Sequence, residues 1–151
     1  MPRNCYHQIY LHITWHTKNN ARLLTGDVEN RAHRYIVHRI AEMPGAFVHE
    51  IGGTEDHIHV AVNVPPTLLI SDWIGDLKGA STHHLNHNVM ARSAFAWQTG
   101  YGVVSFGKKD LPFVVEYVRN QKARHGEGRV YDRLERIEAE EMAEAAVREG
   151  R

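Results

Sequence analysis

The chain has 151 residues, of which 42% are hydrophobic and 24% charged, and its 18 Lys and Arg residues balance its 18 Asp and Glu residues. This composition suits one globular domain with a modest core. Because no apolar run is long enough to span a membrane and the first residues lack a signal peptide's apolar core, we expect a cytosolic protein without a membrane partner. Cys5 is the only cysteine, which excludes an internal disulfide and a cysteine-based zinc site.

The neutral total charge conceals a difference between two parts of the chain. Residues 1–131 hold 14 Lys and Arg against 11 Asp and Glu, a net charge of +3, whereas residues 132–151 hold 4 against 7, a net charge of −3. The second segment is rich in Glu, Ala and Arg and has only a thin apolar stripe. We therefore predict a boundary after Tyr131, with one mildly basic domain before it and an acidic helical tail, without a catalytic signature, after it.

The first half of the chain predicts a strand, a helix and a second strand. Gln8 to Thr17 alternates apolar with polar residues, which is typical of a half-buried strand. Asp27 to Met43 carries apolar residues at helical spacing, and Pro44-Gly45 ends that helix. Phe47 to Ile51 predicts the second strand, and Gly52-Gly53 predicts a turn into the next one.

The second half predicts a strand, a helix, a strand and a final helix. His57 to Val64 alternates, so both histidines of His57-Ile58-His59 lie on one face of a strand. Apolar residues from Ile70 to Leu85 mark a helix, Gly100 to Phe106 a strand, and Leu111 to Lys122 the last helix. This order predicts an α+β fold, the ferredoxin-like split βαβ sandwich, in which a four-stranded antiparallel sheet has helices on one face and the final helix over the other.

Four side chains indicate chemistry on a phosphodiester. Tyr117 and Gln121 are four apart on the last helix, so they lie one above the other and can lean over His57 and His59. Neutral imidazoles and an amide oxygen leave a divalent cation most of its charge and open positions for a phosphate. A tyrosine phenol can attack phosphorus and store the energy of the broken bond in a phosphotyrosine ester. No dedicated general base stands out: the cation and nearby Lys or Arg residues are one means of lowering the phenol's pKa, and water as acceptor of the proton is the alternative.

The sequence resembles a known family in four stretches that keep their order. They are Thr54-Glu55-Asp56-His57-Ile58-His59-Val60, Leu77-Lys78-Gly79, Ala96-Trp97-Gln98-Thr99-Gly100-Tyr101 and Glu116-Tyr117-Val118-Arg119-Asn120-Gln121. Over roughly Tyr6 to His125 the chain is similar to the single-tyrosine HUH transposases of small insertion sequences, which include the REP-associated tyrosine transposases. An H-x-H pair alone is a weak signal, but the ordered set is fairly specific.

The resemblance implies a transposase that acts as a metal-dependent endonuclease and strand transferase on single-stranded DNA. Tyr117 is then the nucleophile, which leaves a 5′-phosphotyrosine link and a free 3′ hydroxyl, while His57, His59 and Gln121 bind Mg²⁺ or Mn²⁺. The implied substrates are element ends folded as hairpins. The implied partner is a second copy, because in such homodimers one chain's histidines can combine with the other chain's tyrosine.

Basic residues near the last two predicted helices are candidates for contacts with DNA phosphates. They are Lys78, Lys108, Lys109, Arg119, Lys122 and Arg124. The alternative interpretation is an ordinary solvated helix face with neighbouring loop charges, in which Lys78 extends along the surface to reach water.

The candidate site has structural alternatives as well. His57 and His59 can be surface residues of an exposed strand, Tyr117 a packing aromatic and Gln121 plain helix surface. Trp97 and Tyr101 fit core or turn positions better than base-stacking ones, and Asp56 can orient an imidazole or shape a turn. The rival function is a non-catalytic ferredoxin-like module that binds hairpin DNA or RNA and forms no covalent adduct.

Overall fold

The computed structural model describes residues 5–90 and 94–138 of the chain. Its strands and longer helices are β1 (Tyr10–His16), α1 (Gly26–Ala41), β2 (Phe47–Gly53), β3 (His57–Asn63), α2 (Ile70–Asn88), β4 (Gly102–Phe106), α3 (Leu111–Arg119) and α4 (Gln121–Gly126). Three 3-10 turns, η1 (Lys18–Asn20), η3 (Lys108–Asp110) and η4 (Asp132–Leu134), complete the described secondary structure. None of the described helices has the length and apolar character needed to cross a membrane.

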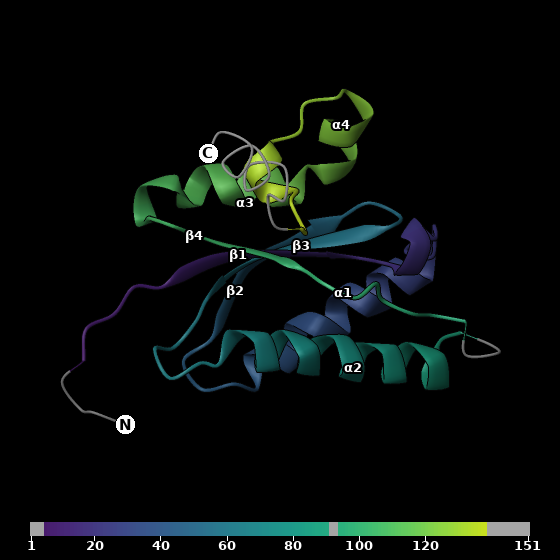
Figure 1. The fold of residues 1–151 in the computed structure, drawn as a ribbon, viewed down its shortest axis with the longest axis horizontal. Helices are drawn as coiled ribbons and strands as arrows, with labels where there is room; N and C mark the ends of the chain where they lie inside the picture. Colours follow the sequence, from purple (N-terminus) through teal and green to yellow (C-terminus); the bar gives the residue numbers. More distant parts are fainter. Residues whose placement is uncertain (1–4, 91–93, 139–151) are drawn as a thin grey trace, which may run out of the picture.

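The four strands form one antiparallel sheet in the order β2-β3-β1-β4 (Figure 1). Strands β3 and β1 occupy the centre, and their register places His57 opposite His16 and His59 opposite Thr14. This strand order and the element order confirm the predicted α+β, ferredoxin-like arrangement. The strand that carries the two histidines is therefore an interior strand, with a neighbour on each side.

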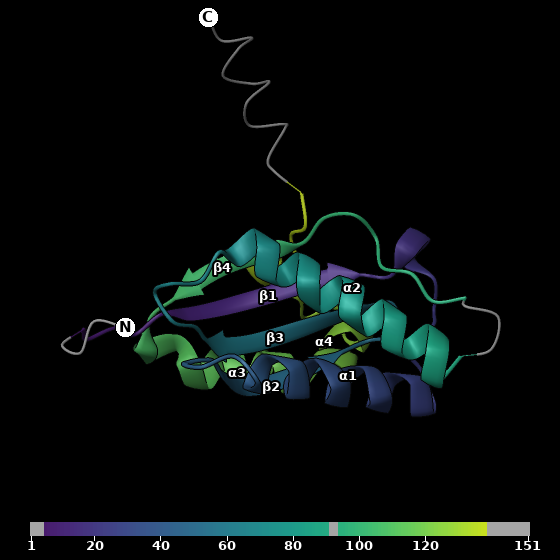
Figure 2. The same cartoon turned by 90° about the horizontal axis from the view of Figure 1, so that it is seen from below.

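The apolar sides of the central strands face α1 and α2. Ile58, Val60 and Val62 of β3 and Ile13 and Trp15 of β1 are at most 1% exposed. The two helices lie side by side under this face of the sheet (Figure 2) and contribute a matching set of buried side chains, namely Ile36, Ile40, Ile74, Leu77 and Leu85. The main core thus lies between these two helices and the sheet, as the alternation in the sequence predicts.

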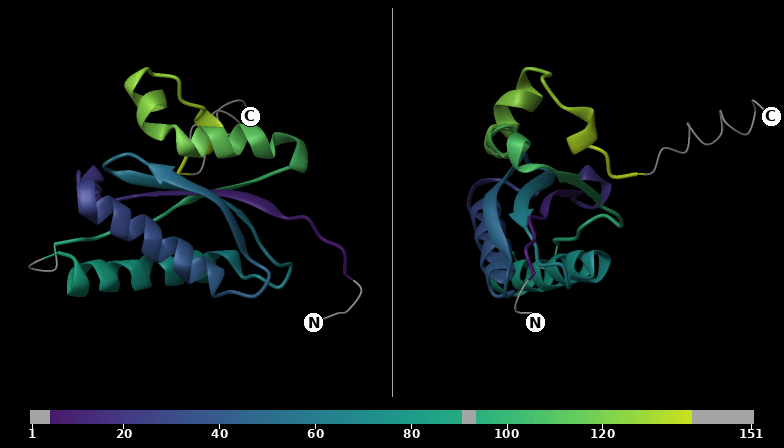
Figure 3. Two further views of the ribbon diagram at one scale, coloured as in Figure 1. Left: turned by 180° about the vertical axis from the view of Figure 1, so that it is seen from behind. Right: turned by 90° about the vertical axis from the view of Figure 1, so that its left-hand side faces the viewer.

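The opposite face of the sheet is covered by α3, α4 and the chain that follows them (Figure 3). Val114 and Val118 of α3 pack there against Ala61 of β3 in a second, smaller core. Gly52 permits this contact, because a Cβ atom at that position would lie 2.0 Å from the carbonyl oxygen of Val118. The polar side of β1, predicted to be half-buried, is also enclosed: His12 and Thr14 are each 1% exposed.

Two sequence-based expectations differ from the structure. The helix predicted from Leu111 to Lys122 is divided at Asn120, whose backbone leaves helical geometry (φ −103°, ψ 30°) while its side-chain amide donates to Glu116 Oε1. The expected helical tail begins with the short turn η4, and Leu134 in it is 2% exposed. Of that tail, residues 139–151 lie outside the described part of the chain. The boundary proposed after Tyr131 stays a prediction.

Candidate active site and metal centre

Both histidines of β3 present Nε2 to the space beneath α3. His57 and His59 are 3% and 0% exposed, and neither Nε2 atom has a hydrogen-bond partner among the described residues. Their other ring nitrogens are engaged: His57 Nδ1 lies 2.6 Å from Asp56 Oδ1, and His59 Nδ1 lies 2.7 Å from His12 Nε2. When Nδ1 carries the proton, Nε2 keeps a free lone pair, which is the form that a metal requires. Asp56 is thus the orienting partner that the sequence suggested.

Burial keeps these imidazoles neutral. Removal from water lowers the pKa of His57 and of His12, and it lowers the pKa of His59 to about 4 against the opposing influence of Glu135. All three rings are therefore unprotonated at neutral pH. An unprotonated, buried nitrogen without a partner is a strong position for a cation ligand.

Glu135 occupies the space between the imidazoles and the phenol. Its Oε2 lies 3.4 Å from His59 Nε2 and 3.6 Å from His57 Nε2, while its Oε1 accepts a hydrogen bond of 2.5 Å from the Tyr117 hydroxyl. His125 Nε2 lies 3.2 Å from the same Oε1. Burial alone would raise the pKa of the Glu135 carboxyl, but the neighbouring His59 and Tyr117 bring it down to about 2. The site therefore contains a carboxylate.

The Tyr117 phenol is enclosed at the centre of the site. The residue is 0% exposed, its ring lies 5.9 Å from that of His59, and the Arg124 guanidinium lies 4.8 Å above the ring. Its oxygen also accepts the backbone N–H of Tyr131 at 2.9 Å. Burial and the bond to Glu135 raise the pKa of Tyr117 to about 12. Without a cation the pKa is thus raised rather than lowered, because the phenol is withdrawn from water and a carboxylate faces the hydroxyl. A lowering by the bound cation stays a prediction.

Gln121 reaches the same region from the start of α4. It is 0% exposed, donates from Nε2 to the Tyr117 carbonyl at 3.0 Å, and places Oε1 3.0 Å from His125 Nε2. The interruption of the helix at Asn120 therefore leaves the side chains of Tyr117 and Gln121 close together. All four side chains singled out in the sequence converge within one chain.

Three further residues complete the site, and the sequence marked them weakly or not at all. His125 follows Gln121 by four positions, so helical spacing was a signal for it. His12 lies on the same face of β1 as His16, but the alternation of side chains in a strand does not predict whether that face is covered. Glu135 has no local signal, because its position depends on how the chain returns to the sheet after α4. Two of them, His125 and Glu135, join His57 and His59 in a group of four whose ligand atoms all lie within 4.8 Å of one another.

The sequence and the fold agree with comparisons to known proteins. Residues 5–121 match the family described as IS200-like transposases. This chain belongs to that family. It is a transposase, an enzyme that cleaves and joins DNA.

Two curated relatives cover most of the transposase. The transposase for insertion sequence element IS200 of Salmonella typhimurium is 27% identical over 115 residues, which cover 73% of this chain and 74% of the relative. The ISDra2 transposase TnpA of Deinococcus radiodurans is 29% identical over 124 residues, which cover 79% of this chain and 88% of the relative. These shares are large on both sides, so the similarity concerns most of each chain rather than one short segment.

Solved structures share the fold of the transposase. A Deinococcus radiodurans protein assigned to the transposases superposes with a TM-score of 0.62 at 21% identity and covers 80% of this chain and 96% of its own. A REP-associated tyrosine transposase bound to a REP hairpin gives a TM-score of 0.58 at 17% identity, with 86% and 75% covered. At these identities the likeness concerns the fold.

The basic residues of the transposase that the sequence offered for DNA contacts fall into two groups. Arg119 pairs with Glu50 at 2.9 Å, Lys122 with Glu29 at 2.8 Å, and Arg124 with Glu116 at 2.7 Å. In contrast, Lys108 and Lys109 are exposed in the η3 turn and form no ion pair with a described residue. These two lysines are therefore the freest of the six to meet a polyanion.

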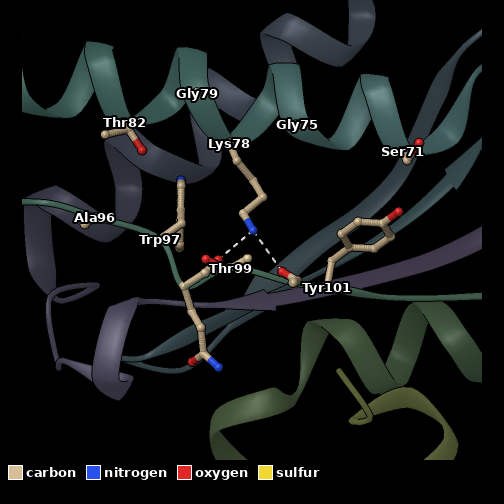
Figure 4. A pocket seen from close by; sticks show the side chains of 11 residues that line it. Ser71, Gly75, Lys78, Gly79, Thr82, Ala96, Trp97, Thr99 and Tyr101 are labelled. Carbon is tan, nitrogen blue, oxygen red and sulfur yellow. Dashed lines mark hydrogen bonds between the residues drawn. The ribbon is translucent and has the colours of Figure 1, made fainter. Parts of the chain in front are cut away.

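Lys78 belongs to neither group, because it contacts the backbone. Its Nζ donates to the carbonyl oxygens of Gln98 at 2.6 Å and Gly100 at 2.8 Å, so it connects α2 with the loop before β4 (Figure 4). The two stretches of resemblance around Lys78 and Trp97 line one hollow of about 510 Å³ between them. Trp97 is 9% exposed and donates from Nε1 to Ser81 Oγ, which agrees with its interpretation as a core aromatic.

Proposed function

We propose that this transposase cuts single-stranded DNA by a metal-dependent attack of Tyr117 on a backbone phosphate and rejoins the ends by the reverse step. One observation carries the proposal: the Tyr117 hydroxyl and the Nε2 atoms of His57 and His59 converge from α3 and β3 on the same small space. A phosphate in that space would contact both the nucleophile and a cation held by the imidazoles. A packing tyrosine and two surface histidines have no reason to meet in this way.

The residues present fit a divalent cation. The buried Nε2 atoms of His57 and His59 lack hydrogen-bond partners among the described residues, and their Nδ1 atoms are held by Asp56 and His12. We assign His57, His59 and Gln121 as ligands and Mg²⁺ or Mn²⁺ as the cation. When bound, such a cation polarises a phosphate and stabilises the departing 3′ oxygen.

In the proposed step, the Tyr117 oxygen forms a bond to phosphorus and the bond from phosphorus to the 3′ oxygen breaks. The products are a 5′-phosphotyrosine ester and a free 3′ hydroxyl. The phenol is protonated at neutral pH, and its proton has Glu135 Oε1 as a hydrogen-bonded acceptor in place. A 3′ hydroxyl that attacks the ester reverses the step and frees Tyr117, so no external energy source is needed for joining.

The proposed substrates are single-stranded ends that fold into hairpins, and the proposed partner is a second copy of the chain. The hairpin in the complex of the structurally similar REP-associated transposase supports the first proposal. Because Tyr117 lies over the histidines of its own chain, we propose that a homodimer serves to hold two DNA ends rather than to complete a site. Exposed Lys108 and Lys109 are the basic residues proposed first for phosphate contacts, and the further candidates are Lys78, Arg119, Lys122 and Arg124.

A cleavage assay tests this function. Labelled single-stranded DNA with hairpins is incubated with the protein and Mg²⁺, Mn²⁺ or EDTA, and then run on a denaturing gel. We expect a covalent protein-DNA adduct that needs the metal and disappears in Tyr117→Phe, because the phenol oxygen is the attacking atom. Tyr131→Phe is the control, since it removes a nearby phenol hydroxyl but keeps the ring that packs on Phe113 and the backbone N–H that donates to the Tyr117 oxygen.

The possible results separate the two functions considered. An adduct that persists in Tyr117→Phe would assign the nucleophile to another residue. Hairpin binding without any adduct, across substrates and metals, would favour the non-catalytic binding module.

A further inference from the structure

The chain that follows α4 contributes a carboxylate to the proposed metal centre. Glu135 belongs to the segment after Tyr131, where the sequence shows no catalytic pattern. Its Oε2 nevertheless approaches the two imidazole nitrogens that have no hydrogen bond within the described part of the chain, at 3.4 Å from His59 Nε2 and 3.6 Å from His57 Nε2. A carboxylate brought to two neutral, oriented imidazoles is a donor set that divalent cations bind.

We infer that Glu135 is an additional ligand of the cation in the DNA-free transposase, bound through Oε2, and that its Oε1 ties the Tyr117 hydroxyl to the same centre. The inference rests on the proposed function, since it concerns the cation that His57 and His59 hold. It extends that proposal, because an anionic ligand in the resting site increases metal affinity and connects the nucleophile to the metal through one carboxylate. A cation that takes six ligands keeps positions for a phosphate oxygen beside it.

The distances agree with ligation. Neighbouring ligand atoms that each lie about 2.1 Å from a six-coordinate cation are about 3.0 Å apart, and they are about 3.4 Å apart at the wider angle of a four-coordinate one. The separations of Glu135 Oε2 from His59 Nε2 and from His57 Nε2, 3.4 Å and 3.6 Å, exceed the six-coordinate value by about half an ångström, so a small movement of the Glu135 side chain brings the atoms to ligand spacing. Both are longer than an ordinary hydrogen bond between these atoms. The three atoms therefore lie near enough to one another to bind one cation.

The surrounding contacts hold Glu135 in this place. Leu134 is 2% exposed, and the guanidinium of Arg133 donates to the Ser105 carbonyl of β4 at 2.5 Å. A Cβ atom at Gly102 would lie 1.9 Å from the carbonyl oxygen of Arg136, so a residue without a side chain lets the segment lie directly on the sheet. These contacts flank Glu135 on both sides in the sequence. Its carboxylate is thus delivered to the site by a packed segment rather than by a free surface chain.

Metal affinity, measured without DNA, tests the inference. Isothermal titration of the full chain with MnCl₂ compares the wild type with Glu135→Gln, Glu138→Gln and His59→Ala. Glu138→Gln is the matched control, because it removes the same charge from an exposed position of the same segment. We expect Glu135→Gln to weaken Mn²⁺ binding by about tenfold or more, because even the substitution of a residue that only hydrogen-bonds a metal ligand typically weakens binding that much. Glu138→Gln should bind like the wild type.

The outcomes distinguish this inference from the proposed function. Wild-type protein that binds no Mn²⁺ would overturn the metal centre and the inference with it. Binding that is lost in His59→Ala but unchanged in Glu135→Gln would overturn the inference alone and leave the centre to His57, His59 and Gln121. An equal loss in Glu135→Gln and Glu138→Gln would also overturn it, because the effect would then be general charge. If Glu135→Gln does not fold, Glu135→Asp keeps the charge but withdraws the carboxylate: weaker binding supports ligation, and wild-type affinity contradicts it.

Discussion

Lys78 shows how the surroundings of one side chain determine its role. The sequence allows a basic residue on the surface of a helix, but its ammonium group instead donates to two backbone carbonyl oxygens in the loop before β4. Partial burial lowers the pKa of this amine, which is consistent with a group withdrawn from water. Its hydrogen bonds therefore join α2 to the loop that carries Trp97.

The first prediction concerns this residue. Lys78→Met keeps the length and apolar part of the side chain but leaves the carbonyls of Gln98 and Gly100 without their donor. We expect the free energy of unfolding to fall by about 1 kcal/mol, since the partly buried Gln98 carbonyl and the exposed Gly100 carbonyl lose a charged donor. Urea denaturation followed by circular dichroism measures the change. Lys109→Met, at an exposed position, should change stability by less than about 0.5 kcal/mol; equal effects of the two variants would contradict this role.

At the scale of elements, glycines decide how closely the second layer approaches the sheet. Gly52 in β2 faces the last turn of α3, and a Cβ atom there would lie 2.0 Å from the Val118 carbonyl oxygen. The backbone of α3, the helix that carries Tyr117, thus contacts the backbone of β2 directly at Gly52. Any group added at this point must push α3 away from the sheet, because backbone cannot yield as a flexible side chain does.

The second prediction follows from that contact. Gly52→Ala should destabilise the fold by about 1 to 3 kcal/mol through overpacking, and it should reduce DNA cleavage more than tenfold by moving Tyr117 from the histidines, given that misplacement by about 1 Å can cost a hundredfold in rate. Urea denaturation and the adduct assay measure the two effects. Gly107→Ala is the matched control, because nothing lies within 4 Å of a Cβ atom there. Wild-type cleavage by Gly52→Ala would mean that α3 does not need this close contact.

The same elements explain what could be predicted from the sequence. The alternating pattern of β3 predicted both the strand and the shared face of His57 and His59, because side chains two residues apart in a strand point to the same side. The apolar residues of α1 and α2 gave the first layer for a similar reason. The enclosure of His12 could not be predicted, since it depends on a segment more than 100 residues later in the chain. Glu135 was missed for the same cause: no local pattern records which part of the sheet a returning segment meets.

At the scale of the whole molecule, the buried site makes stability depend on pH. In the metal-free protein, burial lowers the pKa of His59 to about 4 from its ordinary value of 6.5. Between pH 6.5 and pH 4 the unfolded chain therefore binds a proton at His59 that the folded chain excludes. The contribution of His59 to the free energy of unfolding is fully present above pH 6.5 and is lost as the pH falls toward 4. Glu135, whose pKa is lowered to about 2, adds a loss below its ordinary value of 4.5. The pKa of Tyr117 is raised to about 12 from 10.0, so this residue adds a loss of stability as the pH rises above 10.

The third prediction is a stability maximum between roughly pH 6.5 and pH 10 in EDTA. Between pH 7 and pH 5, His59 alone should remove about 2 kcal/mol from the free energy of unfolding, because each unit of pKa difference corresponds to about 1.4 kcal/mol. Urea denaturation at both values gives this difference. The pH dependence should be smaller in His59→Asn, whatever that variant's stability at pH 7, and unchanged in a variant of the exposed His87, His87→Asn. If the stability of His59→Asn depends on pH as that of the wild type does, the buried imidazole is not the group that titrates. If His59→Asn and His87→Asn reduce the pH dependence equally, burial does not distinguish His59 from a surface histidine.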